Sequence, residues 1–299
     1  MRIYFVLILL FISSLGFAQM LDNEHGKAFS DDPFFNTGFI KRNKIKKIIG
    51  RYSSKELNDK IRDNSNIYVF EFSPEGRLQQ KYRSIEIGNI IDTIVYQYFY
   101  DEKGRISILR KSDQHGFYAT HYTYDTLGRV IIEEKRRDLN KNQDKLNFEL
   151  GQALVFSQET SSYYDVPLQS KRTFFNNYDR PFKDHFKYFN EDGYLLKEET
   201  IMRMTRSRTV LDYKYGDKGF VSEIAKTTTL KGSKPSRQEF AYDELNNLDQ
   251  IKHYRGGVYT TENQLLYNRK SRLLKTVLTR EVATQMITIL ALDEYEFYE

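Results

Sequence analysis

Apolar and polar residues alternate along most of the chain, and short clusters of turn-forming residues interrupt the alternation at regular intervals. The clearest unit reads aromatic, any residue, aromatic, Asp, two variable residues, Gly, Arg, aliphatic, and it is complete at residues 98–106 and 122–130. Alternation with a period of two is typical of β-strands that bury one face. The pattern therefore predicts a series of β-hairpins, one for each copy of the unit.

Less complete copies keep the same order of residue types. They lie at residues 70–78, 175–181, 189–195, 213–221, 240–248 and 265–273. Most copies follow the previous one by 24 to 28 residues, which leaves room for two strands and two connections. A row of hairpins can bury apolar faces that one hairpin cannot bury alone. We therefore expect an all-β fold in which residues 43–299 form an extended antiparallel meander of hairpins, arranged as a curled or spiral single sheet.

The segment Asp-x-x-Gly between two alternating runs predicts a three-residue hairpin loop. The Asp side chain caps a type I turn, and the Gly takes up the left-handed conformation that residues with a Cβ avoid. The residues assigned to this structural role in the complete copies are Asp101, Gly104, Arg105, Asp125, Gly128 and Arg129.

Counting outward from this loop places an aromatic residue opposite an aliphatic one in each hairpin. The expected pairs are Tyr100–Ile106, Tyr98–Ile108, Tyr124–Val130, Tyr122–Ile132, Phe72–Leu78, Tyr215–Val221, Tyr242–Leu248 and Tyr267–Leu273. Cross-strand contacts of this kind contribute roughly 0.2–1 kcal/mol each. We interpret the paired rings as the core of the sheet.

The two ends of the chain differ from the repeats. Residues 19–42 predict a polar, mobile leader, and residues 43–52 predict a first strand whose Lys44, Lys46 and Lys47 protect an open edge. The last residues, 293–299, are expected to close the other end, with Tyr295 and Phe297 on one face. Helical spacing is scarce, and its short examples are Ser54–Asp63 and Leu146–Ala153.

Composition narrows the class of protein. The 299 residues include 23 Tyr and 21 Phe, far more rings than a disordered chain carries. Because there is no Cys, a disulfide framework, a thiolate metal site, a cysteine nucleophile and a lipoprotein anchor are excluded. The formal net charge of +5 is small for this length, so composition does not predict a nucleic-acid partner.

The first 18 residues have the order of a Sec signal peptide. A basic residue precedes an apolar run at residues 3–12, and the small residues Gly16 and Ala18 occupy the −3 and −1 positions. The run is about half the roughly 20 residues that a spanning helix needs. We expect residues 1–18 to be cleaved, no membrane span to remain, and the protein to reach the periplasm, the outer surface or the extracellular medium.

The phrase Tyr-Asp-x-x-Gly-Arg, complete at residues 100–105 and 124–129, resembles the YD repeats of the bacterial Rhs and eukaryotic teneurin families. The resemblance implies a long antiparallel sheet that spirals into a shell, a surface or secreted role, and carbohydrate binding. The chain lacks the Asp-Pro self-cleavage motif of Rhs cores and any segment after the repeats that could be a toxin. The signal peptide with its Ala-Gln junction is similar to those of small secreted repeat proteins of Bacteroidetes.

Two groups of residues suggest metal binding. Asp138–Glu149 spaces oxygen ligands like a calcium loop, but Gln143 replaces the required Gly and Lys145 adds positive charge, so a solvated loop is the favoured interpretation and calcium stays an alternative. The histidines show no short ligand spacing, although a site shared by the nearby pair His115 and His121 stays open. The five histidines are His25, His115, His121, His185 and His253. No cofactor is predicted.

Candidates for ligand contact lie outside the predicted core. Tyrosines on the face opposite the paired rings could stack on sugars, and we assign Tyr118, Tyr163 and Tyr259 to this face. The basic residues between Lys41 and Lys47 could meet a polyanion, but a solvated edge strand is the favoured interpretation.

No nucleophile elbow, P-loop or dinucleotide fingerprint occurs, and no catalytic residue is assigned. The sequence favours a secreted, non-enzymatic β-repeat scaffold that binds a glycan or a cell-envelope protein. An interaction module of a polymorphic-toxin or toxin-antitoxin system is the alternative. An envelope hydrolase is a third, and it would need two facing carboxylates about 5–9 Å apart.

Overall fold

The computed structural model describes residues 19–87, 90–113, 115–142 and 144–299. The predicted signal peptide, residues 1–18, lies outside the described residues. The strands are β1 (Ile45–Lys55), β2 (Arg62–Phe72), β3 (Leu78–Ile87), β4 (Ile90–Tyr100), β5 (Ile106–Asp113), β6 (Gly116–Tyr124), β7 (Val130–Asn140), β8 (Leu150–Val166), β9 (Gln169–Phe175), β10 (Pro181–Phe189), β11 (Leu195–Met202), β12 (Arg208–Tyr215), β13 (Val221–Thr228), β14 (Ser236–Tyr242), β15 (Leu248–Arg255), β16 (Val258–Tyr267), β17 (Leu274–Glu281) and β18 (Ile287–Phe297).

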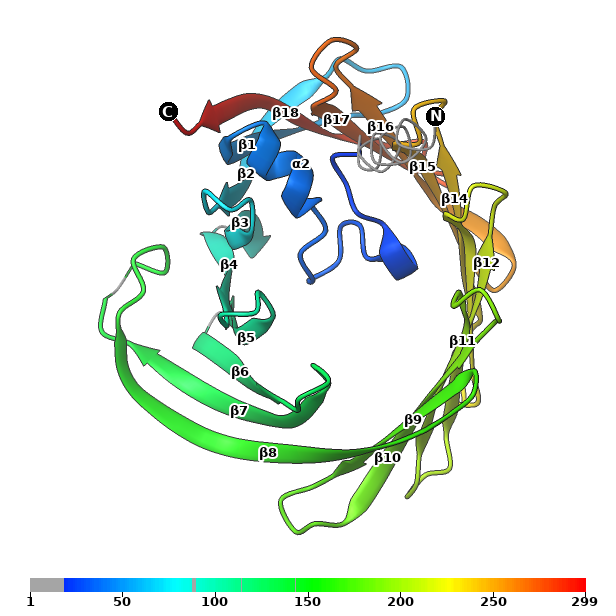
Figure 1. The fold of residues 1–299 in the computed structure, drawn as a ribbon. Helices are drawn as coiled ribbons and strands as arrows, with labels where there is room; N and C mark the ends of the chain where they lie inside the picture. Colours follow the sequence, from blue (N-terminus) through cyan, green and yellow to red (C-terminus); the bar gives the residue numbers. More distant parts are fainter. Residues whose placement is uncertain (1–18, 88–89, 114, 143) are drawn as a thin grey trace, which may run out of the picture.

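These strands form one closed antiparallel barrel. Each strand pairs with its neighbours in sequence, and β1 pairs with both β2 and β18, so that Ile48 lies opposite Phe70 on one side and Tyr295 on the other. The ring of strands is visible in Figure 1. The expected all-β antiparallel meander is confirmed, but the curled or spiral open sheet is wrong. Local hairpin signals specify only the next strand, whereas closure depends on a pairing between the two ends of the chain.

Closure also changes the role of the first strand. Because β1 is paired on both sides, the described barrel wall has no open edge there for Lys44, Lys46 and Lys47 to protect. Pairing an edge removes its unsatisfied backbone groups more completely than flanking charges do. The expected edge strand is therefore wrong. Tyr295 and Phe297 do lie on one face, with stacked rings 6.3 Å apart.

The segments with helical spacing are not helical. Residues 54–63 contain the end of β1, a turn and the start of β2, and residues 146–153 contain bends and the start of β8. Charged loop residues with occasional Leu and Ile imitate an amphipathic helix over such short lengths. Within the described residues the helices lie instead in the leader, as a single 3₁₀ turn η1 (Glu24–Gly26) and α2 (Thr37–Arg42). The first turn of α2 is capped by Asn36 Oδ1, which accepts from Phe39 N at 2.9 Å.

The leader is packed inside the barrel rather than mobile in solvent. Met20 and Phe34 are fully buried, and they share one core with residues from both halves of the wall. Figure 1 shows this segment, in dark blue, within the ring of strands. A barrel of this many strands is too wide for its own side chains to fill. The few apolar residues of a mostly polar segment therefore supply the missing core.

Lys81 on β3 fastens the leader to the wall. The side chain is 2% exposed, and its Nζ donates hydrogen bonds to the carbonyls of Ser30 at 2.7 Å and Asp31 at 3.0 Å. The ammonium also lies 4.7 Å from the centre of the Tyr96 ring. Burial lowers the pKa of Lys81 to about 8. The buried cation is thus satisfied by leader carbonyls and aromatic faces.

The hairpin turns have the predicted chemistry. Gly104 and Gly128 both have φ of 80°, and Asp101 accepts from the backbone N–H of Arg105 at 2.9 Å. Arg129 makes the same backbone contact with Asp125 at 2.8 Å. In both turns the Asp side chain accepts from the backbone and the Gly takes up the left-handed conformation, as the sequence predicts.

The predicted register is right next to five of the six turns and wrong one step further out. At the sixth turn, Tyr267 lies opposite Leu274 instead of Leu273, because the loop between them is one residue longer. Tyr100 lies opposite Ile106, but Tyr98 lies opposite Leu109 instead of Ile108. A β-bulge between these pairs inserts one residue into the returning strand. The confirmed pairs are Tyr100–Ile106, Tyr124–Val130, Phe72–Leu78, Tyr215–Val221 and Tyr242–Leu248. The corrected pairs are Tyr98–Leu109, Tyr122–Glu133 and Tyr267–Leu274.

Tyrosine hydroxyls link most hairpins to the one before. Seven tyrosines donate to a backbone carbonyl at the start of the preceding hairpin's return strand, over 2.5–3.0 Å. We call this set the tyrosine ladder, and its bonds are Tyr100 to Leu78, Tyr124 to Ile106, Tyr163 to Val130, Tyr215 to Leu195, Tyr242 to Val221, Tyr267 to Leu248 and Tyr295 to Leu274. The recurring tyrosine of the sequence unit is therefore a joint between repeats.

Removing one ladder hydroxyl is expected to weaken the barrel modestly. Tyr124→Phe deletes the donor to the Ile106 carbonyl and keeps the ring, so the free energy of unfolding should fall by about 0.5–1.5 kcal/mol. Urea denaturation followed by circular dichroism measures this change. Tyr178→Phe, at a side chain that is 82% exposed, is the matched control. If the Tyr124 variant were as stable as the parent, the hydroxyl of Tyr124 would not stabilise the contact between the two hairpins.

Candidate functional site

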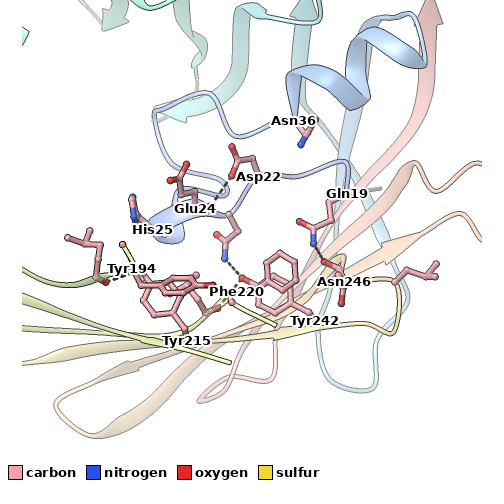
Figure 2. Close-up of a pocket in the computed structure, with 16 residues that line it drawn as sticks. Gln19, Asp22, Glu24, His25, Asn36, Tyr194, Tyr215, Phe220, Tyr242 and Asn246 are labelled. Carbon is pink, nitrogen blue, oxygen red and sulfur yellow. Dashed lines mark hydrogen bonds between the residues drawn. The ribbon is translucent and has the colours of Figure 1, made fainter. Parts of the chain in front are cut away.

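A cleft lies between the leader and the tips of three neighbouring hairpins, β10–β11, β12–β13 and β14–β15. Its volume is about 580 Å³. Residues of the leader line one side and residues of the three turns line the other (Figure 2). The lining residues are Gln19, Asp22, Asn23, Glu24, His25, Asn36, Gly193, Tyr194, Leu195, Tyr215, Gly219, Phe220, Val221, Tyr242, Leu245 and Asn246.

Two packed ring pairs form the wall side of the cleft. The rings of Tyr194 and Tyr215 lie 4.8 Å apart, and those of Phe220 and Tyr242 are stacked at 5.0 Å. Tyr215 and Tyr242 belong to the tyrosine ladder, so their hydroxyls are fixed to backbone carbonyls. The cleft is therefore built on rings that the barrel already holds rigid.

The repeat itself explains why rings gather here. In a complete copy the residue after Gly is Arg, and Arg105 lies 4.2 Å over the ring of Tyr124 in the next hairpin. Tyr194 and Phe220 occupy the same position after Gly193 and Gly219. Each packs on the next ladder tyrosine as Arg does, but presents an apolar ring in place of a cation.

Hydrogen bonds fix the leader against these rings. Asn23 is buried, and its Nδ2 donates to the hydroxyl of Tyr242 at 3.0 Å. The side-chain amide of Gln19 donates to the carbonyl of Asn246, as drawn in Figure 2. The two sides of the cleft are thus joined at two points, and the cleft exists only while the leader is docked.

The leader adds carboxylates and a histidine. Asp22 Oδ1 accepts from the backbone N–H of Glu24 at 3.0 Å, while Oδ2 pairs with Lys27 at 2.6 Å. The side chain of Glu24 is exposed. Burial lowers the pKa of His25, whose ring meets Tyr213 edge-on at 5.8 Å. Hydroxyl, amide, carboxylate and aromatic groups therefore surround one hollow.

The described residues contain no cluster of three His, Asp or Glu side chains that could hold a metal ion. The calcium-like spacing does not gather its ligands, because Asp138 is buried in a pair with Arg110 at 2.8 Å and Lys145 reaches Asp92 at 2.7 Å. Gln143 lies outside the described residues.

The three tyrosines assigned to a ligand face do not come together. Tyr163 belongs to the tyrosine ladder, so it lies on the core face and not on the opposite one. Tyr118 is 41% exposed and pairs across the sheet with Lys111, on the face that also carries Tyr96. Tyr163 and Tyr118 lie on the core face because side chains alternate between the two faces of their strands without interruption.

Tyr259 alone among these three lies on the outer face. Its hydroxyl donates to Glu262 at 2.8 Å, and its ring lies 5.2 Å from that of Tyr254. A bulge at Thr260, between the pairs Tyr254–Tyr259 and His253–Thr261, reverses the alternation at this point. Ligand binding by these tyrosines stays a prediction, since the cleft lies elsewhere.

No helix in the part of the chain that the structure describes has the length and apolar character needed to cross a bilayer. No protein-family model matches the chain. No curated protein is similar to it.

Several solved structures are distantly similar in fold. A porin-like protein from Bacteroides uniformis has a TM-score of 0.39 at 10% identity and covers 85% of this chain and 97% of its own. A porin-like protein from Bacteroides vulgatus has a TM-score of 0.31 at 10% identity, covering 72% and 96%. TcdB2-TccC3 without its hypervariable C-terminal region has a TM-score of 0.29 at 11% identity, covering 83% of this chain and 16% of its own. At these TM-scores the likenesses carry no inference about function.

Proposed function

We propose that the protein is an exported, non-enzymatic β-barrel that binds a short glycan in the cleft between its leader and its hairpin tips. Export rests on the predicted signal peptide, and glycan binding rests on the two ring pairs beside the polar leader. The C–H faces of a sugar pack on aromatic rings, and its hydroxyls pair with carboxylates and amides. A hollow of about 580 Å³ is within the size range of small-ligand sites.

Ion pairs on the outside of the wall support a barrel that faces water. On β11, Glu198 accepts from Tyr213 of the core, so the next residue, Glu199, points outward, where it pairs with Arg208 at 2.5 Å. Similar outward pairs join Arg280 to Glu262 and Arg203 to Asp184. A lipid-facing barrel carries an apolar band in this position. The proposed ligand therefore meets the protein from the aqueous phase.

A glycan array probed with residues 19–299 tests the proposal. We expect at least one class of glycan to be retained, and we expect Tyr194→Ala to weaken its binding by about tenfold or more, because one face of the platform is lost. Tyr178→Ala, in the turn of another hairpin, is the control. Thermal melting of both variants separates lost binding from lost folding.

Two results would overturn parts of this proposal. An array on which no glycan is retained removes glycan binding. If mass spectrometry detects shortened glycans after prolonged incubation, the protein is a hydrolase and the non-enzymatic part of the proposal is wrong. Asp22 and Glu24, the two carboxylates that line the cleft, would then be the first candidates for catalytic residues.

A further inference from the structure

The surroundings of the cleft are acidic although the protein as a whole is basic, with a formal charge of +5. Leader residues 19–27 and the turns at 190–193, 216–219 and 243–246 carry seven carboxylates and two ammonium groups. The carboxylates are those of Asp22, Glu24, Glu191, Asp192, Asp217, Asp243 and Glu244, and the ammonium groups are those of Lys27 and Lys218. The field at the mouth of the cleft is therefore opposite in sign to the net charge of the chain.

The ammonium groups near the cleft are already engaged, including that of Lys187 beside His25, which pairs with Glu198 at 3.3 Å. Lys27 pairs with Asp22 at 2.6 Å, and Lys218 Nζ donates to Asn246 Oδ1 at 2.7 Å. Within the described residues no salt bridge joins Glu24 to a Lys or Arg. The excess negative charge is thus left for a bound molecule.

The repeat has lost its cations at this place. The residue after the turn Gly is Arg77, Arg105 or Arg129 in three hairpins outside the cleft, whereas Tyr194 and Phe220 stand there within it. Each change removes a positive charge and exposes a ring face. Rings beside carboxylates are the combination that attracts an organic cation.

We propose that the cleft selects glycans with a free ammonium group, that is, amino sugars that are not acetylated. This inference rests on the proposed glycan binding and narrows it. A bare metal ion does not satisfy the same field, since no three ligand side chains of the described residues converge. A protonated amino sugar does, because it brings an ammonium group, hydroxyls and an apolar ring face together.

Three β-1,4-linked disaccharides of equal length test this: those of glucosamine, of N-acetylglucosamine and of glucose. Calorimetry with residues 19–299 is performed at about pH 6, where an amine with a pKa of about 8 is protonated. We expect the glucosamine disaccharide to bind about tenfold more tightly than the other two in about 20 mM salt. The preference should shrink in about 0.5 M salt, because exposed charges are screened.

Matched variants locate the preference. Glu24→Gln should reduce the preference for the glucosamine disaccharide about threefold, while Glu102→Gln, in the turn of a hairpin outside the cleft, should leave it unchanged. Equal affinity for all three disaccharides, or an array that retains only uncharged glycans, overturns this inference and leaves the proposed function standing. An array that retains no glycan overturns both.

Discussion

Phe34→Ala is expected to destabilise the protein by about 3–5 kcal/mol, the range found for deleting a fully buried phenylalanine ring. Phe34 has no exposed surface. Its ring is stacked on Phe35 at 4.9 Å and meets Phe70 of the wall edge-on at 5.8 Å. The ammonium of Lys81 lies 5.5 Å from the same ring. The substitution therefore opens a cavity between the leader and the wall.

Urea denaturation of residues 19–299 measures the change, with Tyr178→Ala as a control that should shift the free energy of unfolding by less than about 0.5 kcal/mol. Hydrogen exchange gives a second readout. If the leader undocks before the wall unfolds, amides of residues 19–42 should lose protection in the variant first. A variant as stable and as protected as the parent would contradict the view that the leader completes the core of the barrel.

The same residues explain how far the sequence predicts the fold. Gly104 and Asp101 specify a turn within a few residues, so the hairpins and most of the pairs next to the turns follow from the pattern. A single inserted residue then shifts the partner of Tyr98, which no period-two pattern reveals. Closure requires β1 and β18 to meet across the whole chain, and no local signal encodes that contact.

The cleft escaped prediction for a related reason. Its leader side comes from a segment whose polar composition hides a few buried residues such as Met20. A signal for the other side was present, because Tyr194 and Phe220 break the Gly-Arg pattern in adjacent copies. Departures from a local rule tend to mark functional sites. The two rings form one side of a cleft only because the leader docks beside them, and the sequence pattern does not predict that docking.

Alkaline pH is expected to unfold the protein steeply, because the tyrosine ladder is buried. Burial raises the pKa of all seven ladder tyrosines and of Tyr98, whose hydroxyl donates to the carbonyl of Asp31. Burial also raises the pKa of Tyr122 to about 12. In the unfolded chain these phenols ionise near pH 10.

The sign follows from proton linkage. Above about pH 10 the unfolded chain has lost phenolic protons that the native barrel keeps, so the unfolded state binds fewer protons and the free energy of unfolding falls as pH rises. One unit of pKa difference is worth about 1.4 kcal/mol per group, and total stability is about 5–15 kcal/mol. Because many such groups act together, we expect the stability to be exhausted between about pH 10.5 and 11.5.

Ionisation of Lys81 has the opposite effect on the free energy of unfolding, and it acts over a lower pH range. Its pKa is about 8 in the folded protein and about 10.4 when unfolded, so the unfolded chain binds more protons between these values and stability rises there with pH. The parent should therefore gain stability from about pH 8 to 10 and lose it abruptly above, while Lys81→Met should lack the initial gain and keep the later loss. Urea midpoints at each pH measure both limbs, and NMR of tyrosine ring carbons follows ionisation directly. Ladder tyrosines that ionise near pH 10 while circular dichroism still reports an intact barrel would refute the argument, because buried hydroxyls bonded to backbone carbonyls cannot lose their protons without opening the joints between the hairpins.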